Sequence, residues 1–452
     1  MNRISIIIFL VLMTAWGQAQ LKISMDKRFL VTETGKPFFW LGDTGWELFH
    51  RLNREEADLY LKDRKVKGFT VIQAVILAEL EGLTVPNPYG HTPLLNNDPG
   101  RPNEAYFQHV DYIINKAESL GLIIALLPSW GDKWNKKWGV GPEVFTPENA
   151  RQFGVFVGRR YKAKPVVWVM GGDRDIDEPQ DREIIQAMAA GLKQGDGGRH
   201  LMTFHPQGGK SSSDFFNGEN WIDFHMSQTG HGNDSRNYLF NQKHLSMDPL
   251  RPHLDGEPRY EDHPNKFNPA QHGWMDDFDA RQCAWWSMLS GAFGHTYGNH
   301  NIWQFYTEER KPISWARTHW KTALHHAGAT QTGLMRRMLE QRPWQRLVPD
   351  QSLILSPNPE GAEYNVASVS ADGDFLLAYL PYGKKIKLAT DKIKGGMLRV
   401  WWFNPRDGRT LPLDEQKNEG ILELQPHSEG RGSDWVLVID DAGKNYKDPA
   451  VR

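Results

Sequence analysis

Residues 38–300 alternate between two hydrophobic patterns. Short apolar runs rich in β-branched and aromatic residues are separated by longer stretches whose apolar residues recur every three or four positions. The short runs are apolar almost throughout, as expected of strands that are buried on both faces of a parallel sheet. The pattern predicts eight strands, at residues 37–44, 69–77, 122–130, 165–173, 200–206, 221–230, 251–258 and 291–298.

The stretches between these strands predict helices with clear ends. Asn53 precedes one helical stretch and Gly68 follows it, while Thr146 and Pro147 begin another, and these residue types are favoured at those positions. The segment between the fifth and sixth strands is too short and polar for a full helix. The clearest helices are expected at residues 53–68, 101–121, 146–162 and 179–195.

Eight strands that alternate with helices predict an α/β fold, namely a (β/α)8 TIM barrel over residues 20–340. A doubly wound open sheet is the alternative. No Gly-x-Gly-x-x-Gly motif follows the first strand, however, and the number of strand–helix units fits a closed barrel better.

The pattern changes after about residue 340, where helical periodicity disappears. Short runs such as "FLLAYLP", "MLRVWWFNP" and "DWVLVID" are separated by turn sequences such as "ADGD" and "PRDG". This pattern predicts a small antiparallel β-sandwich over residues 345–443.

The first residues have the pattern of an export signal. Arg3 precedes an apolar run from Ile4 to about Trp16, and small residues follow it, so we expect a signal peptide at residues 1–19 that is cleaved after Ala19. No Cys follows that site to carry a lipid anchor, and no other stretch is long and apolar enough to span a membrane. The expected location is the periplasm or the exterior of a bacterial cell. The single cysteine, Cys283, excludes an internal disulfide and suits a periplasm.

Composition narrows the class of partner. The chain has 53 Lys and Arg against 55 Asp and Glu, a formal net charge of −2, which argues against a nucleic acid or an anionic membrane as partner. The 18 tryptophans are many for 452 residues. Most are expected in the core, but flat aromatic faces also stack on sugar rings.

Two carboxylates stand where a barrel carries its chemistry, at the C-terminal ends of strands. Asp173 follows two glycines in "VVWVMGGDRD", and Glu257 follows Gly256 in "HLDGEP". Glycosidic hydrolysis needs such a pair, one carboxyl protonated and one ionised. We expect the glycines to leave room for a ligand, and residues 253, 255 and 257 to share one inward face. Asp175 and Asp255 are the rival acids.

Other polar and aromatic residues at the strand ends are predicted to bind substrate: Asp43, Trp46, Gln73, Ser129, Trp130, His205, Gln228, His295 and Tyr297. Three tryptophans lie four residues apart in "SWGDKWNKKWG", at positions 130, 134 and 138. If that loop is helical, they form one aromatic stripe, either a sugar platform or a lid. Packing under the loop is the alternative.

These motifs carry a family resemblance. "PFFWLGDTGWELFHRLNREEADLYLKDRKVKGFTVIQ", "VVWVMGGDRD" and "DGEP" resemble the apiosidase-like glycoside hydrolases, which include glycoside hydrolase family 140. The C-terminal segment is similar to the small domain, labelled collagen-binding, that follows those barrels. The resemblance implies a retaining mechanism, with Asp173 as acid/base and Glu257 as nucleophile, and cleavage at apiose in pectic rhamnogalacturonan II.

The chain departs from the wider clan at one point. Where the clan has Asn-Glu at the end of the fourth strand, this chain has Gly172-Asp173. The acid is one methylene shorter, and another group has to bind the sugar 2-hydroxyl.

The leading hypothesis is therefore a secreted glycosidase that acts on plant cell-wall oligosaccharides or polysaccharides, without metal or cofactor. A non-catalytic carbohydrate-binding protein is one alternative. A metal-dependent barrel hydrolase is another, with His205 and His225 as candidate ligands, but the first strand lacks the His-x-His that such sites use.

Overall fold

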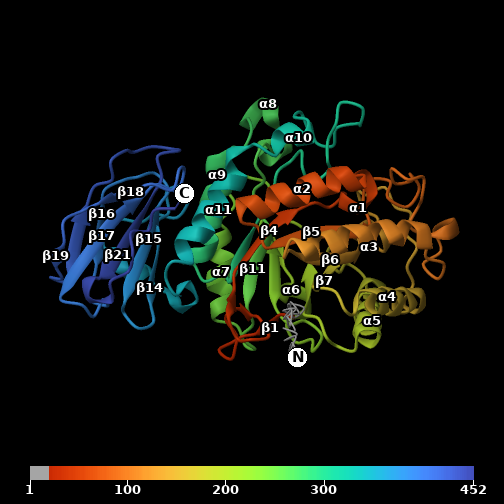
Figure 1. The fold of residues 1–452 in the computed structure, drawn as a ribbon, viewed down its shortest axis with the longest axis horizontal. Coiled ribbons are helices and arrows are strands. Elements are labelled where there is room, and N and C mark those ends of the chain that lie inside the picture. The colour runs from red at the N-terminus through yellow and green to blue at the C-terminus, as the bar shows by residue number, and fades with distance from the viewer. Residues whose placement is uncertain (1–19, 452) are drawn as a thin grey trace, which may run out of the picture.

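The computed structural model describes residues 20–451, so the predicted signal peptide lies outside the described residues. Eight parallel strands form the centre of the N-terminal unit, as predicted (Figure 1). They are β4 (Trp40–Thr44), β5 (Val71–Leu77), β6 (Ile123–Ser129), β7 (Val166–Gly171), β8 (Met202–His205), β10 (His225–Gln228), β11 (His253–Glu257) and β12 (Gly294–Tyr297).

The strands pair in the order β8-β7-β6-β5-β4-β12-β11-β10, and the two-residue β9 (Lys210–Ser211) adds to β10 in antiparallel. The remaining gap, between β8 and β10, is bridged by hydrogen bonds. Asp223 N donates to Met202 O at 2.8 Å, and Thr203 Oγ1 donates to Phe224 O at 2.7 Å. The sheet therefore closes on itself, which confirms the predicted TIM-barrel fold.

Helices surround this barrel. The long helices are α2 (Arg54–Lys67), α3 (Glu104–Ser119), α4 (Pro147–Tyr161), α5 (Pro179–Asp196), α7 (Asn237–Leu245), α9 (Asp277–Leu289) and α11 (Ala327–Leu339). Short helices are α1 (Leu48–Arg51), α6 (Ser213–Phe216), α8 (Pro269–His272) and α10 (Trp320–Ala323). The predicted caps of α2 are present, because Asn53 accepts from Glu56 N and Gly68 is left-handed, with φ 94°. No helix within residues 20–451 has both the length and the apolarity needed to cross a bilayer.

Side chains alternate between the inside and the outside of the barrel. Trp40, Phe224 and Phe293 pack inside it, and Leu21 and Leu30 of the N-terminal segment join the same cluster. That segment forms a small antiparallel sheet of β1 (Lys22–Ile23), β2 (Leu30–Val31) and β3 (Pro37–Phe38), which covers the end of the barrel where the strands begin. The opposite end of the barrel, where the strands end, is not covered by this segment and carries the candidate active site.

The C-terminal unit is the predicted antiparallel sandwich. Its larger sheet has the order β13-β14-β15-β21-β17-β18, with β19 paired to β17, and its smaller sheet is the pair β16-β20. The strands are β13 (Leu347–Pro349), β14 (Val366–Ser370), β15 (Phe375–Leu380), β16 (Ile386–Ala389), β17 (Met397–Phe403), β18 (Thr410–Pro412), β19 (Gln416–Lys417), β20 (Ile421–Leu424) and β21 (Trp435–Asp441).

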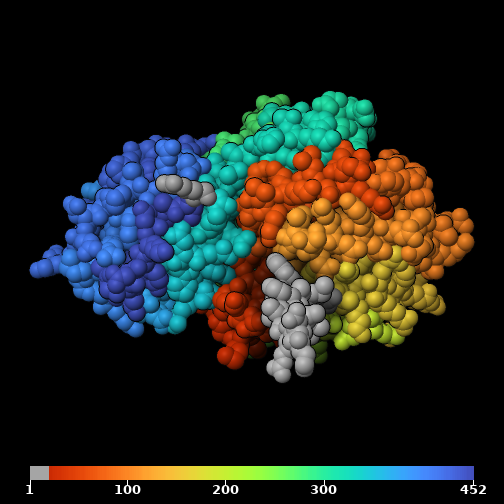
Figure 2. Space-filling view, viewed as in Figure 1, coloured from red at the N-terminus to blue at the C-terminus, as the bar shows by residue number. Residues whose placement is uncertain are grey.

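The large sheet buries both faces. One face packs on the small sheet through residues such as Leu376 and Leu437. The other face shares a hydrophobic cluster with the outer helices of the barrel, where Trp285 of α9 stacks on Tyr379 at 6.0 Å between ring centroids. The blue C-terminal unit therefore lies directly against the barrel (Figure 2). The two units are joined by one continuous apolar contact.

An ion pair lies within this contact. Arg281 Nε and Nη2 donate to the two carboxylate oxygens of Asp434 at 2.8 and 2.7 Å, and both side chains are buried. Tyr379 Oη also donates to Asp434, at 3.0 Å. A bidentate pair of this kind holds the sandwich in one orientation on α9.

We predict that Asp434→Asn lowers the free energy of unfolding by roughly 3 kcal/mol, because it leaves the Arg281 charge buried without its full partner. Arg431→Gln is the matched control, because Arg431 pairs with Asp276 and Asp279 across the same interface but is itself 43% exposed. Its loss is expected to cost about 1 kcal/mol or less. Equal effects of the two substitutions in denaturant unfolding would contradict a special role for the buried pair.

Candidate active site

A cavity of about 440 Å³ opens at the C-terminal end of the barrel. Every barrel strand, or the loop that follows it, contributes to its lining. The residues are Trp46, Glu79, Trp130, Trp138, Asp173, Gln207, Gly208, Gln228, Gly230, His231, Glu257, Tyr260, His263, Phe267, His300, Trp303, Ile313 and Ser314. Both predicted carboxylates lie in it, together with predicted binding residues Trp46, Trp130 and Gln228.

Asp173 reaches the cavity through an unusual backbone. Gly171, Gly172 and Asp173 all have positive φ, at 88°, 112° and 55°. A Cβ on Gly171 would lie 2.4 Å from His205 O, and one on Gly172 would lie 3.0 Å from the Trp130 backbone. The space beside the glycines is therefore filled by the neighbouring strands rather than open to a ligand, which corrects that expectation. Aspartate is among the few non-glycine residues that tolerate the left-handed region.

Glu257 reaches the cavity through a β-bulge. Along β10 and β11, Ser227 pairs with Asp255 but Gln228 pairs with Glu257, so Gly256 is an extra residue. The bulge reverses the alternation that residues 253, 255 and 257 would otherwise share. His253 and Asp255 face the outer helices, where Asp255 accepts from Thr229 Oγ1 at 2.7 Å, and only Glu257 turns inward. The prediction of a common inward face is thus wrong, and the rival acid Asp255 lies outside the barrel.

Gln73 holds this bulge from inside the barrel. Its Nε2 donates to the carbonyl oxygen of Gly256 at 2.7 Å, and the side chain is fully buried. Gln73 therefore lies beneath the cavity, not in its lining. Its role in the structure is to support the backbone that carries Glu257.

His205 connects the two carboxylate-bearing segments. The backbone N–H of Asp173 donates to His205 Nδ1 at 3.2 Å, so the neutral ring carries its proton on Nε2. That Nε2 lies 2.9 Å from Glu257 Oε2. On the other side of the carboxylate, His231 Nε2 lies 3.0 Å from Glu257 Oε1. Each oxygen of Glu257 thus faces an imidazole nitrogen.

These surroundings separate the acidities of the two groups. Burial raises the pKa of Glu257, but the contacts of its carboxylate oxygens with the imidazole nitrogens of His205 and His231 outweigh it and lower the pKa below the usual range. Burial, together with the Glu257 charge, raises the pKa of Asp173 to about 6. Up to about pH 6, a protonated Asp173 and an ionised Glu257 are therefore present in the same cavity, which is the combination that glycoside hydrolysis requires.

Arg174 makes only a long ion pair with Asp173, and its charge offsets part of the rise in the pKa of that carboxyl. Its Nη1 is 3.4 Å from Asp173 Oδ2, while its shorter hydrogen bonds go to the carbonyl oxygens of Asp173, Asn135 and Lys136. Its guanidinium also lies under the ring of Trp138, 4.0 Å from the centroid. Arg174 therefore fixes the loop that carries Trp138.

The three tryptophans of this loop do not form a stripe. A short 3-10 turn at Gly131–Lys133 is followed by irregular chain. Trp134 is buried in the outer core, Trp130 lines the cavity floor, and Trp138 stands at the rim with 56% of its surface exposed. Trp138 thus has an exposed ring at the rim of the cavity, while Trp134 has the packing role considered as the alternative.

Four predicted binding residues lie away from the cavity. Asp43, His295 and Tyr297 sit at outward-facing strand positions: Asp43 accepts from Tyr60 and Arg64, His295 pairs with Ser287, and Tyr297 donates to Glu261. Ser129 donates to the Trp130 carbonyl and lies beside Met170 on the helix side. Each of these polar groups has a partner within the protein, so none of them is presented to a substrate.

The rival acid Asp175 lies beyond the turn, where its carboxylate accepts from Gln207 N at 3.4 Å. The candidate metal ligands do not meet either. His205 faces inward, whereas His225 pairs with Ser212 and Asn217 outside the barrel. Within residues 20–451, no three His, Cys, Asp or Glu side chains are grouped as a metal site.

Several lining residues were not predicted, and most come from loops. His263, His300 and Trp303 follow β11 and β12, and burial lowers the pKa of both histidines, which keeps their rings neutral. Glu79 is a third carboxyl, two residues beyond β5; burial and the nearby Asp173 raise its pKa to about 8. Its place just after a strand end was the one signal in the sequence for this residue.

Comparison with known families and solved structures agrees with this geometry. Residues 24–346 match the family described as "Apiosidase-like, catalytic domain", and residues 348–440 match "Putative collagen-binding domain of a collagenase". A comparison with curated protein sequences gave no match.

Two solved structures resemble the chain over nearly its whole length. One, named "Glycoside hydrolase", is 32% identical with a TM-score of 0.88, covering 96% of this chain and 99% of its own. The other, a glycoside hydrolase family 5 protein from Bacteroides vulgatus ATCC 8482, is 31% identical with a TM-score of 0.88, covering 96% and 95%. The barrel, its two opposed carboxyls and these matches together show that the chain belongs to the apiosidase-like family of glycoside hydrolases.

Proposed function

We propose that this glycoside hydrolase is a retaining enzyme that acts on pectic cell-wall glycans at apiose, with Glu257 as nucleophile and Asp173 as acid/base. The observation that carries the proposal is the cavity in which an ionised Glu257, held by two histidines, faces a protonated Asp173. The Glu257 charge contributes to the raised pKa of Asp173.

In the first step, Glu257 attacks the anomeric carbon while Asp173 gives its proton to the leaving oxygen, and a covalent glycosyl-enzyme forms. The charge of Glu257 disappears in that bond. One cause of the raised pKa of Asp173 disappears with it, so Asp173 becomes ready to take a proton from water. Water then attacks the same carbon and releases Glu257.

The lining of the cavity supports a sugar as ligand. Trp46, Trp130, Trp138, Tyr260 and Trp303 offer aromatic faces, and neutral imidazoles lie between them. The volume of about 440 Å³ is within the range of small-ligand sites. The choice of apiose rests on the family, and Gln228 and Glu79 are the polar groups that take the place of the clan's asparagine near Asp173.

Glu79 is the rival for the acid role, since it too retains its proton. The Glu257 charge is among the main causes of the Asp173 shift but not of the Glu79 shift. Asp173 also shares His205 with Glu257. Both observations favour Asp173 over Glu79 as the acid that works with the nucleophile.

We also propose that the protein is exported to the periplasm or beyond the cell. The support is the sequence of residues 1–19, with Arg3 before an apolar run and small residues at its end.

Glu257→Gln is expected to reduce kcat on an apiose-bearing rhamnogalacturonan II oligosaccharide by about 10⁴-fold or more, because the nucleophile is lost. Asp173→Asn should lower kcat by about 10²–10⁴-fold on that substrate, and less on an aryl apioside whose leaving group needs no proton. Glu79→Gln is the matched comparison for Asp173→Asn, because Glu79 is the rival for the acid role. Product analysis by NMR should show the retained anomer, and an inverted product would contradict a nucleophilic Glu257.

The pH dependence follows from the two pKa shifts. Activity requires Asp173 protonated, so kcat/KM should fall by about tenfold per pH unit above pH 6, where Asp173 loses its proton. It requires Glu257 ionised, and the lowered pKa of Glu257 keeps it so well into the acid range. An alkaline limb near pH 8 instead would assign the acid role to Glu79, whose pKa is raised to about 8.

Gln73→Leu tests the support of the bulge. The substitution leaves the Gly256 carbonyl without its donor, so Glu257 should lose its alignment and kcat should fall by about tenfold or more, with a smaller change in KM. Gln73→Glu, protonated through burial, should restore part of the activity at low pH. Unchanged kinetics in a folded Gln73→Leu protein would show that the bulge needs no such support.

A further inference from the structure

Three histidines that line the catalytic cavity have rings in contact with one another. They come from three different loops: His231 follows β10, His263 follows β11 and His300 follows β12. The ring of His263 contacts both of the others, with a distance of 4.4 Å between centroids in each case. The row of rings begins at Glu257, whose Oε1 lies 3.0 Å from His231 Nε2, and it ends at the loop after β12.

The orientation of His231 decides whether this residue reaches Glu257. An ionised carboxylate only accepts, so Nε2 of His231 carries the proton in their contact. The other ring nitrogen, Nδ1, is buried and has no hydrogen-bond partner among residues 20–451. Gly230 and Gly232 flank the residue, so the neighbouring chain restrains it little. Within this part of the chain the ring has no second hydrogen bond, and its orientation depends on packing.

Three rings pack around His231. Tyr260 is tilted against it, with centroids 4.5 Å apart and planes at 56°, and Phe267 meets it edge-on at 5.9 Å. The ring of His263 is close to parallel, 4.4 Å away with planes at 24°. A stacked ring at this distance blocks rotation of the imidazole out of its own plane. His263 is also only 2% exposed, whereas Phe267 is 52% exposed, so His263 gives the firmer support.

His263 is itself held in place. Its Nδ1 lies 2.8 Å from the carbonyl oxygen of Pro264, and because a carbonyl oxygen only accepts, Nδ1 carries the proton. Burial and the neighbouring imidazoles lower the pKa of His263, which keeps the ring neutral. The ring of His300 packs edge-on against it, with planes at 74°, and His300 Nε2 donates to Ser314 O at 2.8 Å.

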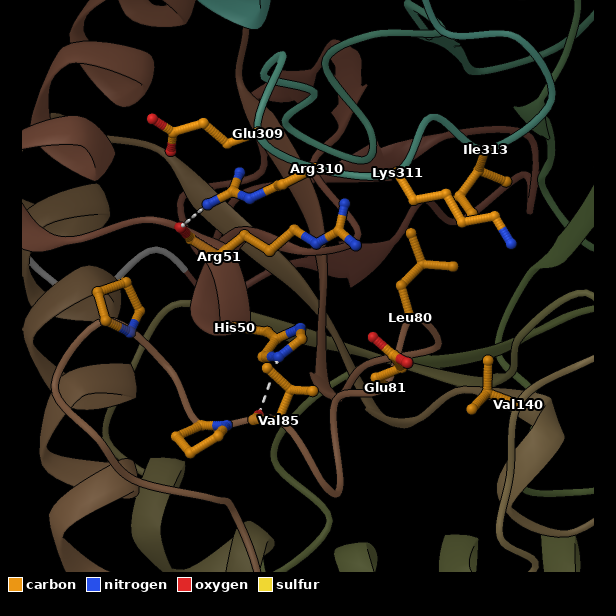
Figure 3. Close-up of a pocket in the computed structure, with 12 residues that line it drawn as sticks. His50, Arg51, Leu80, Glu81, Val85, Val140, Glu309, Arg310, Lys311 and Ile313 are labelled. Atoms are coloured by element: carbon orange, nitrogen blue, oxygen red, sulfur yellow. Dashed lines mark hydrogen bonds between the residues drawn. The ribbon is translucent and has the colours of Figure 1, made fainter.

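The loop after β12 anchors this end of the row. Ile313, next to Ser314, exchanges two hydrogen bonds with the side chain of Gln304, at 3.0 and 3.3 Å. Ile313 also lines a second cavity, of about 620 Å³, on the other side of the loop (Figure 3). There Arg310 of the same loop donates to the Arg51 carbonyl oxygen of α1 at 2.9 Å (Figure 3). The row of rings therefore ends on a loop that is tied to the rest of the barrel.

We propose that His263 is a positioning residue whose ring holds the imidazole of His231 so that Nε2 faces the carboxylate of Glu257. The proposal rests on the proposed function in one respect, that Glu257 is the nucleophile. It adds that ring stacking, rather than a hydrogen bond, fixes one of the two imidazoles beside this carboxylate. His205, the other imidazole, is fixed differently, because its Nδ1 accepts the backbone N–H of Asp173.

The groups that face Glu257 determine what the loss of this support does. Besides His231 they are His205 at the end of β8, Asp173 after β7 and Tyr260 after β11. Burial raises the pKa of Glu257, and the two histidines lower it. When His231 is no longer held in place, one lowering cause is lost and the pKa of Glu257 rises. The acid limb of activity, which requires ionised Glu257, then moves to higher pH.

Two substitutions of His263 separate its ring from its hydrogen bond. His263→Phe keeps a ring for stacking but loses the donor to Pro264, whereas His263→Asn keeps an amide donor and loses the ring. On an aryl apioside, His263→Asn should lower kcat by about tenfold with a smaller change in KM, and His263→Phe should stay within about threefold of wild type. The acid limb of kcat/KM should move up by about one pH unit in His263→Asn only.

Titration of the Glu257 carboxyl by ¹³C NMR gives a readout that needs no turnover, and the Glu257→Gln protein identifies the signal. Its midpoint should rise by about one pH unit in His263→Asn and stay unchanged in His263→Phe. His109→Asn is the matched control for loss of a buried ring, since His109 of α3 is 2% exposed and its Nε2 lies 2.9 Å from Leu52 O. It should lower stability in denaturant unfolding and leave the Glu257 midpoint unchanged.

The positioning role and the proposed activity fail separately. An unmoved Glu257 midpoint in a folded His263→Asn protein, or an equal shift in His263→Phe, would overturn the positioning role even if the wild-type chain cleaves the apioside. If the midpoint rises in His263→Asn alone but the wild-type chain cleaves no apioside, the positioning role stands and only the proposed activity is overturned.

Discussion

The contact of Glu257 with two imidazoles is the interaction on which the rest of the site depends. His205 and His231 keep this buried carboxylate ionised, and its charge helps to keep Asp173 protonated. His205 also accepts the backbone N–H of Asp173, so one ring fixes the position of one acid and the charge of the other. The difference in pKa between these two carboxyls thus arises from burial, from the two imidazoles beside Glu257 and from the charge of Glu257 itself.

The fold was largely predictable from the sequence, because strands that are buried on both faces give apolar runs that are easy to recognise. The same feature hid which side chains face inward. When both faces of a strand are apolar, the sequence does not show which alternate residues face the inside of the barrel. Asp43, His295 and Tyr297 face the helices. The polar residues at strand ends were located correctly, but whether each side chain points into the barrel or towards the helices was not predicted.

Two further parts of the site lay beyond sequence reasoning. The bulge at Gly256 reverses the direction of Glu257, and a single extra residue in one strand leaves no mark on the hydrophobic pattern. His300 and Trp303 come from a long loop whose path depends on tertiary contacts. Asp173 and Glu257 could be predicted because their motifs end strands, whereas the residues that set their acidity could be predicted only in part. His205 was recognised, and His231 was not.

The glycine pair before Asp173 has a consequence for how this scaffold can vary. Neighbouring backbone occupies the space where any side chain at positions 171 or 172 would stand. That turn is therefore closed to variation, and a clan-like asparagine cannot be restored at 172 without moving the adjacent strands. Divergence towards new sugars must instead arise in the surrounding loops, which can lengthen or change composition while the acid-bearing turn stays constant.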